Sequence, residues 1–216
     1  MNRLILICTV FLCLLGCATC KTVMNRSDAV NKKNGLTAFN PKRRSQLPKY
    51  SLAIMARGKA DKDRMSRYLR HNNSKISKQK ADYFASTYIA ECAIEGVNHD
   101  IAFTQMCHET NFLRFGGQVK PNQNNFAGLG ATDNGANGAS FPTIKIGVRA
   151  QVQHLKAYAS TASLNRDRVD PRFENVVKAG YCGSVKVLDN LTGKWATDPA
   201  YANSIKKKLR DMFMLK

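Results

Sequence analysis

The sequence predicts a mainly α-helical domain with one small, irregular β-lobe. After residue 50, apolar residues recur in most segments at the three- and four-residue spacing of amphipathic helices. Residues 116–146 contain instead six glycines and two prolines, which a regular helix would not tolerate. The chain has no internal repeat and no series of alternating strands long enough for a sandwich or barrel. We therefore expect helices interrupted by one loop or lobe that lines a site.

The first 17 residues have the pattern of an export signal. Arg3 precedes an apolar run over residues 4–15, which is too short to span a membrane as a mature helix. The sequence Leu-Leu-Gly-Cys, ending at Cys17, resembles a bacterial lipobox, in which the signal is removed and the cysteine is lipidated. The alternative is an ordinary secretory signal cut near Ala18. We expect an exported lipoprotein, anchored to the membrane through Cys17 and facing the periplasm or cell envelope, where disulfides are permitted.

Residues 18–49 are predicted to form a flexible basic tether. They contain eight Lys and Arg residues against one acid and show little apolar periodicity. Residues 50–216 add 25 Lys and Arg against 14 acids, so the whole chain carries a formal charge of +19. This charge suits an anionic polymer such as nucleic acid, a lipid surface or an acidic cell wall. The export signal argues against nucleic acid, and no zinc-finger, zipper or RNP pattern occurs.

Two amphipathic helices are predicted at the start of the domain that spans residues 50–216. The first covers residues 61–73 and the second covers residues 77–96, with Gly96 as its stop. Their apolar faces are formed by Met65, Tyr68 and Leu69 in the first, and by Ala81, Phe84, Ala85, Tyr88, Ile89 and Cys92 in the second.

The next predicted helix begins after Asn98 as its cap, has Asp100 in its first turn, and carries a second acid, Glu109, near its end. Glu109 lies three residues after Met106 and three before Phe112, so it shares their face at the edge of the buried stripe. We expect this helix to end at the paired glycines 116 and 117. Partial desolvation would raise the pKa of Glu109 towards the range where a general acid is useful. The alternative is an ordinary surface glutamate.

Two more helices complete the prediction. One begins at Gly147 and places Val148, Val152, Leu155 and Tyr158 on one face. The last begins with Asp198 as cap and Pro199 at the first helical position. Its apolar face consists of Ala202, Ile205, Leu209, Met212 and Phe213.

The cysteines and histidines do not indicate a metal site. Cys17 and Cys20 have CxxC spacing but no second pair, so we expect neither zinc nor another cofactor. Cys92 and Cys107 lie on neighbouring predicted helices and either bond or pack as small apolar groups. His108 and His154 lack HExxH or comparable spacing, which favours packing or hydrogen bonding. A peptidase or amidase is disfavoured because GxSxG is absent and adjacent Cys107 and His108 side chains diverge.

Four ordered blocks resemble the glucosaminidase domain of glycoside hydrolase family 73. They are DIAFTQMCHETNFLRFGG, NNFAGLG, FPTIKIGVRAQVQHLKAYAS and GKWATDPAYANSI. The resemblance covers roughly residues 50–216 and is strongest from Ile101 onward. It implies a lysozyme-like helical fold with a small β-lobe. It also implies an enzyme that cleaves the β-1,4 bond after N-acetylglucosamine in peptidoglycan glycan strands. We expect a monomeric enzyme of the endo type, with exo cleavage as the alternative.

The resemblance assigns roles to individual residues. Glu109 matches the family's general acid, and Tyr201 matches the tyrosine implicated in catalysis after the WATDP stretch. Trp195 is expected to line a sugar subsite while partly packing. Phe126 is expected to be either a sugar platform or a lobe core residue. Residues expected to contact substrate are Asn125, Phe126, Trp195 and Tyr158; Asn124 and Asn125 either bind acetamido groups or form turns.

The second catalytic group is less well defined. Asp133 is the only acid between Glu109 and Asp167 and lies in ATDNGANG, where family members carry a second acid. It either acts as base or stabiliser or is a turn residue. Without it, the substrate's own 2-acetamido group would attack the anomeric carbon. A lytic transglycosylase and a non-catalytic wall-binding lipoprotein are the alternative functions.

Overall fold

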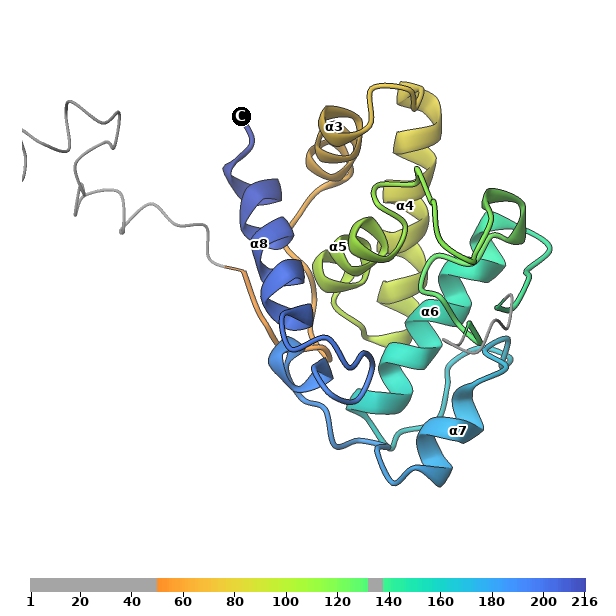
Figure 1. Cartoon of the computed structure of the whole chain (residues 1–216). Helices are drawn as coiled ribbons and strands as arrows, with labels where there is room; N and C mark the ends of the chain where they lie inside the picture. Colours follow the sequence, from red (N-terminus) through yellow and green to blue (C-terminus); the bar gives the residue numbers. More distant parts are fainter. Residues whose placement is uncertain (1–49, 132–137) are drawn as a thin grey trace, which may run out of the picture. The chain divides into compact units, whose positions relative to one another are not determined.

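The predicted helical class is confirmed by the computed structural model, which describes residues 50–131 and 138–216 (Figure 1). The described residues form six α-helices and two short 3-10 helices, η1 and η2. β-structure in this part of the chain consists of isolated bridges, such as the one between Ala53 and Val187. The elements are α3 (Lys62–Asn72), α4 (Lys78–Glu95), α5 (His99–Glu109), η1 (Pro121–Gln123), α6 (Ile144–Ala159), α7 (Phe173–Lys178), η2 (Leu188–Leu191) and α8 (Tyr201–Met214).

Helix α5 is the central helix of this arrangement. It packs against α4 on one side and α8 on the other, as Figure 1 shows, and also contacts α6. Every residue from His99 to Cys107 is buried. Asn98 caps the helix as predicted, since its side-chain oxygen accepts a hydrogen bond from the Asp100 N–H at 3.0 Å. The only part of α5 that reaches the surface is its last turn, which ends at Glu109.

The predicted boundaries of the first two helices are also confirmed. Asp61 precedes α3 and its carboxylate accepts the Arg64 N–H at 2.7 Å. Ser77 precedes α4 and its hydroxyl accepts the Lys80 N–H at 3.2 Å. Gly96 ends α4 with a φ of 74°, a left-handed conformation that glycine adopts without steric cost.

The prediction that the Glu109 helix runs to the paired glycines is wrong. The helix ends at Glu109, and Asn111, Phe112 and Leu113 follow with left-handed φ values of 47°, 57° and 62°. Thr110 holds this turn, because its hydroxyl donates to the Met106 carbonyl at 2.7 Å and accepts the Leu113 N–H at 2.9 Å. Each left-handed residue costs about 1 kcal/mol. The turn directs the Phe112 ring into the core beside Tyr68, which offsets that cost.

Two other helix starts differ from the prediction. Helix α6 begins at Ile144, three residues before Gly147, because the Thr143 hydroxyl caps it by accepting the Ile146 N–H at 3.2 Å. Helix α8 begins at Tyr201 instead of Pro199. The Asp198 carboxylate accepts the Ala200 N–H at 2.8 Å and so forms a turn that precedes the helix. The short helix α7 was not predicted.

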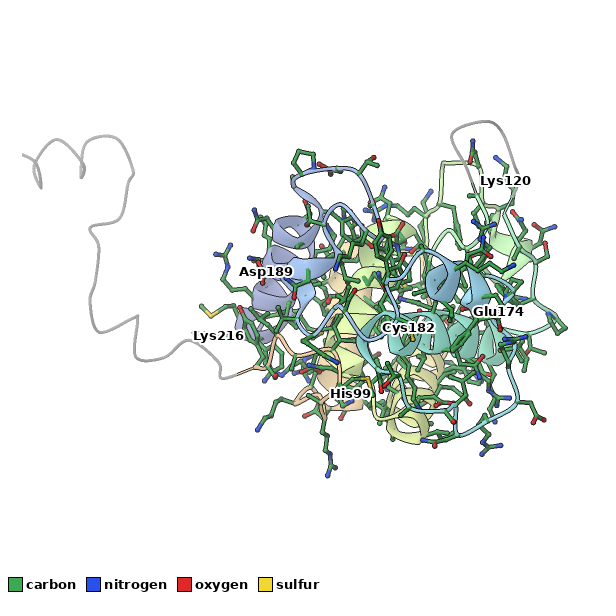
Figure 2. All side chains as sticks on the ribbon, turned by 90° about the horizontal axis from the view of Figure 1, so that it is seen from below. His99, Lys120, Glu174, Cys182, Asp189 and Lys216 are labelled. Carbon is green, nitrogen blue, oxygen red and sulfur yellow. The ribbon has the colours of Figure 1, made fainter. Side chains whose placement is uncertain are left out.

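The lobe between α5 and α6 is irregular, as expected, and contains η1 among turns. It packs closely on α6 at Gly147, where a Cβ would lie 1.8 Å from the Asn124 carbonyl oxygen. Any larger residue at position 147 would push the lobe away from α6. Figure 2 shows Lys120, which precedes η1, well separated in this view from His99 at the start of α5.

Cys92 and Cys107 are buried and free, so they pack as apolar groups and do not bond to each other. In the described ranges, no group of His, Cys, Asp and Glu is arranged to hold a metal ion. None of the helices found there is long and apolar enough to cross a membrane. The predicted signal, Cys17 and the tether lie outside the described residues.

Candidate active site

Glu109 is held at the end of α5 by two residues from much later in the chain. Its Oε1 accepts a hydrogen bond from the Trp195 indole N–H at 3.1 Å and another from the Tyr201 hydroxyl. Trp195 lies in the loop before α8, and Tyr201 is the first residue of α8. The packing of α5 against α8 therefore brings together three residues that the sequence separates by about ninety positions.

The surroundings of Glu109 favour its neutral form. The side chain reaches solvent, but neighbouring protein atoms displace much of the water around the carboxyl group, and this burial raises its pKa. The hydrogen bonds from Tyr201 and Trp195 act in the opposite direction and are outweighed. Burial also raises the pKa of Tyr201 well above its ordinary value, with the nearby Glu109 adding to the effect. Tyr201 is therefore a neutral hydrogen-bond donor.

The second carboxylate oxygen, Oε2, is available for chemistry. Among the described residues, none donates a hydrogen bond to it. It faces a pocket of ≈ 120 Å³ whose walls include Phe115, Asn125 and Gly128. Gly128 has a φ of 63°, and a Cβ built on it would lie 3.8 Å from Oε2. The bare glycine backbone thus leaves room for a substrate atom beside Oε2.

Trp195 is supported by a cluster of aromatic rings. The His154 ring lies edge-on to it at 4.9 Å between centroids, and the Tyr158 ring lies at 5.7 Å. His154 is oriented in turn by Asp170, whose carboxylate lies 2.7 Å from Nδ1. Tyr158 donates its hydroxyl to the Lys194 carbonyl at 3.0 Å and is buried. Tyr158 therefore supports the Trp195 loop through its ring and its hydroxyl group.

The residues predicted in the lobe have different surroundings. The Asn125 side chain donates to the carbonyls of Leu129 and Ala139 at 2.9 and 3.0 Å and accepts the Leu129 N–H at 3.0 Å. It holds the lobe turn and contributes to the pocket wall. Phe126 is 2% exposed and packs edge-on against Phe84, so of the two expected roles its position favours the lobe core over a sugar platform. Asp133 lies outside the described residues.

Two buried glutamines lie behind Tyr201 and were not predicted. Gln105 donates from Nε2 to the Tyr201 hydroxyl oxygen at 2.9 Å, and Gln151 of α6 contacts Gln105. A signal for both was present in the sequence. Gln105 precedes Glu109 by four residues and so shares its helix face, and Gln151 interrupts the apolar face formed by Val148, Val152 and Leu155.

His108 packs edge-on against the Tyr201 ring at 5.3 Å between centroids. Burial lowers its pKa, and the nearby Lys208 lowers it further. A neutral imidazole therefore lies beside the site.

A larger hollow of ≈ 810 Å³ lies at the opposite end of α5, near His99. Its one lining acid, Asp61, is used as the cap of α3. We place the site at Glu109 because its free carboxylate oxygen, and not the size of the hollow, provides a reactive group.

This arrangement is suited to acid catalysis. It presents one carboxyl group whose neutral form is favoured, with one oxygen held by two donors and the other facing a pocket. Among the described residues that line this pocket, Glu109 is the only acid. Such a carboxyl group can donate its proton to the oxygen atom of a substrate bond and thereby promote cleavage of that bond.

Comparison with known proteins agrees with this chemistry. The family model described as glucosaminidase, mannosyl-glycoprotein endo-beta-N-acetylglucosaminidase, matches residues 85–213. The matched range includes Gln105, Glu109, Trp195 and Tyr201. An "uncharacterized protein" of Borreliella burgdorferi is 42% identical over 167 residues, which are 77% of this chain and 80% of that protein.

Proposed function

The chain belongs to the glucosaminidase family, and from this premise we propose that it hydrolyses the β-1,4 bond after N-acetylglucosamine in peptidoglycan. Family membership makes the protein a glycosidase. The observation that supports Glu109 as its general acid is the contrast between the two carboxylate oxygens. Oε1 is fixed by Trp195 and Tyr201, and Oε2 faces the pocket beside Gly128.

The proposed reaction begins with transfer of a proton from Glu109 to the glycosidic oxygen. The bond to the anomeric carbon breaks and leaves an oxocarbenium-like centre that needs a stabilising partner. Either the 2-acetamido group of the sugar or the carboxylate of Asp133 would supply this partner. Ala131, two residues before Asp133 in the sequence, contributes to the pocket wall.

The remaining expectations concern the substrate and the place of action. The excess of basic residues in residues 50–216 suits an anionic wall polymer. We propose that the enzyme works as an exported endo-type glucosaminidase, monomeric and anchored by a lipid on Cys17. The basic residues 18–49 would then let the domain extend from the membrane to glycan strands.

The decisive experiment compares the full chain with its Glu109→Gln variant on a cell-wall suspension. The wild-type protein should solubilise the wall, and the variant should not, while both give the same circular dichroism spectrum. Mass spectrometry of the released fragments should find N-acetylglucosamine at the reducing end. Undiminished clearing by Glu109→Gln would overturn the assignment of the general acid.

One observation favours a second candidate, a lytic transglycosylase. Glu109 is the only acid among the described residues of the pocket wall, and a transglycosylase also relies on a single glutamate. Its fragments would end in 1,6-anhydro-muramic acid, which the same mass spectra distinguish. A wall-binding lipoprotein without activity would sediment with the wall and release no fragment.

The anchor has a separate test. Cells that express the full chain are grown with an alkyne-labelled fatty acid, and the protein is examined for label. We expect label in the wild-type protein and none in Cys17→Ala. Equal labelling of the two would place the lipid elsewhere, and no label in either would indicate an ordinary secretory signal.

A further inference from the structure

Behind Glu109, each residue in a chain of hydrogen bonds donates to the next, from Gln151 to Gln105, to Tyr201 and to Glu109. We propose that Gln105 and Gln151 are positioning residues that force Tyr201 to donate to Oε1, so that Glu109 carries its catalytic proton on Oε2. This inference rests on the proposed function for the meaning of "catalytic", but the direction of the hydrogen bonds follows from the structure alone.

The direction is set by a backbone carbonyl, which can only accept. Gln151 Nε2 lies 2.9 Å from the Ala102 carbonyl oxygen, so this atom of the amide must be the nitrogen. The same nitrogen lies 2.8 Å from Gln105, and the atom it meets there must therefore be Oε1. The Tyr88 hydroxyl donates to Gln151 Oε1 at 2.6 Å, which agrees with this orientation.

The orientation of Gln105 then determines that of Tyr201. With Oε1 of Gln105 facing Gln151, its Nε2 faces the Tyr201 hydroxyl at 2.9 Å and donates to the phenol oxygen. A tyrosine hydroxyl has one proton, and here it is left to point at Glu109 Oε1. If a protonated Oε1 donated to the Tyr201 oxygen, the Tyr201 hydrogen would have to turn towards the Gln105 amide nitrogen, which donates and cannot accept it.

This leaves Oε1 of Glu109 unsuited to carry a proton. It already accepts hydrogen bonds from Tyr201 and Trp195, and a hydrogen placed there would point towards those donors. Oε2 has no such donor among the described residues, and Gly128 leaves space beside it. The glycosidic oxygen must therefore approach from the Gly128 side of the carboxyl group.

Burial makes the arrangement rigid. Tyr88, Gln105 and Gln151 are all 0% exposed, and Tyr201 is 2% exposed. Turning either amide over would place an oxygen against a carbonyl oxygen, or a nitrogen against another hydrogen-bond donor, and both arrangements are costly for buried groups. The free energy favours one orientation throughout.

Few other charged groups face this carboxyl group. Its hydrogen-bond donors are Tyr201 on α8 and Trp195 in the preceding loop. On its own helix, His108 lies against the Tyr201 ring and is affected by Lys208 and Asp198. From α6, Tyr158 acts on Tyr201. Asp133 lies outside the described residues.

The test is Gln105→Met, which keeps the volume of the side chain and removes its amide. The Tyr201 hydrogen is then no longer opposed by the Gln105 NH₂ group, so it can turn away from Oε1, and a protonated Oε1 can donate to the phenol oxygen. The neutral form of Glu109 is stabilised with its proton on the wrong oxygen. We expect kcat for wall solubilisation to fall about 10-fold with KM unchanged, and the alkaline limb of the pH profile to move to higher pH.

Tyr88→Phe is the matched control. It removes a buried hydrogen bond from the same cluster, but the Ala102 carbonyl still orients Gln151. We expect both variants to lose stability, and only Gln105→Met to shift the pH profile. In a Tyr201→Phe background, Gln105→Met should cause no further shift. If Tyr88→Phe moves the profile as much as Gln105→Met does, the glutamines have a structural role only.

A second readout is independent of activity. Carboxyl carbon NMR of glutamate-labelled protein, with Glu109→Gln to assign the signal, gives the pKa of Glu109 without substrate. A higher pKa in Gln105→Met than in the wild type supports the inference even if the protein releases no wall fragment, in which case the proposed function alone fails. An active wild-type protein whose Glu109 titrates identically in Gln105→Met overturns the inference.

Discussion

The two ends of α5 carry the helix's two aspartate and glutamate side chains in opposite settings. Asp100, in the first turn, is 0% exposed, and its oxygens accept the N–H groups of Lys59 and Ala60 at 2.7 and 3.0 Å. Glu109, the last residue, reaches solvent and has one oxygen without a donor among the described residues. The same helix uses one carboxylate to hold the chain, and the other is the one that we propose as the general acid.

The number of hydrogen bonds that each carboxylate accepts distinguishes the structural acid, Asp100, from the acid that we propose as reactive, Glu109. At the N-terminus of α5, the helix dipole and backbone donors stabilise a negative charge. At its C-terminus the dipole disfavours a negative charge, in the same direction as the burial that raises the pKa of Glu109. At the N-terminal end of α5, His99 adds a further contact with the preceding segment by donating from Nε2 to the Ala60 carbonyl at 3.0 Å.

The largest expected contrast comes from neutralising each acid in turn. Glu109→Gln should lower the rate of wall solubilisation by about 100- to 10,000-fold, since it removes the group that we propose as the proton donor. Asp100→Asn should change the rate per folded molecule by about 2-fold or less. Equal losses from both substitutions would show that Glu109 acts through the fold and not through its proton.

For the free energy of unfolding we expect the opposite order, with Asp100→Asn causing the larger loss and Glu109→Gln the smaller. Asp100→Asn replaces one acceptor oxygen by an NH₂ group that opposes a buried backbone N–H, and we expect a loss of about 1.5–3 kcal/mol. Glu109→Gln should stay within about 0.5 kcal/mol of the wild type at neutral pH. Urea unfolding followed by circular dichroism measures both. A stable Asp100→Asn protein would mean that the contacts with Lys59 and Ala60 are dispensable.

A glycine lies beside each of the two acids, Gly58 beside Asp100 and Gly128 beside Glu109. A Cβ at Gly58 would lie 2.7 Å from the His99 ring and 2.8 Å from Asp100 Oδ1, so Gly58→Ala should destabilise by about 1–3 kcal/mol. Gly128→Ala meets only ordinary contact with Oε2, at 3.8 Å, but it fills the approach to that oxygen. We expect kcat/KM to fall roughly 10- to 100-fold, with about 1 kcal/mol of backbone strain. Kinetics and unfolding of both variants should separate the two ends.

The smallest expected effect concerns pH. Because the folded-state pKa of Glu109 is raised, the folded protein binds more protons than the unfolded chain between the two pKa values. The stability of the wild type should therefore fall as pH rises through that window. Glu109→Gln removes this loss, so its stability relative to the wild type should improve with rising pH. Thermal unfolding across this range measures the difference, and parallel curves for the two proteins would contradict the raised pKa.

Local features of the fold could be predicted because their causes lie within a few residues. The caps at Asn98 and Gly96 and the apolar faces of α3 and α4 depend on neighbours one or two turns away. The left-handed turn after Glu109 could not be predicted, since it is stabilised by packing of Phe112 against Tyr68, more than forty residues earlier. The capping threonine of α6 was a local signal that the nearby glycines obscured.

The site divides in the same way. From the sequence alone we expected Glu109 near the end of a helix, at the edge of its buried stripe, and the resemblance added Tyr201 and Trp195 as site residues. The packing of the helices was needed to show that both donate to the same oxygen of Glu109, with Gln105 and Gln151 behind Tyr201. Periodicity and caps depend on residues that are close in the sequence. The direction of the buried hydrogen bonds depends instead on the packing of α5, α6 and α8, which brings the Ala102 carbonyl next to the Gln151 amide.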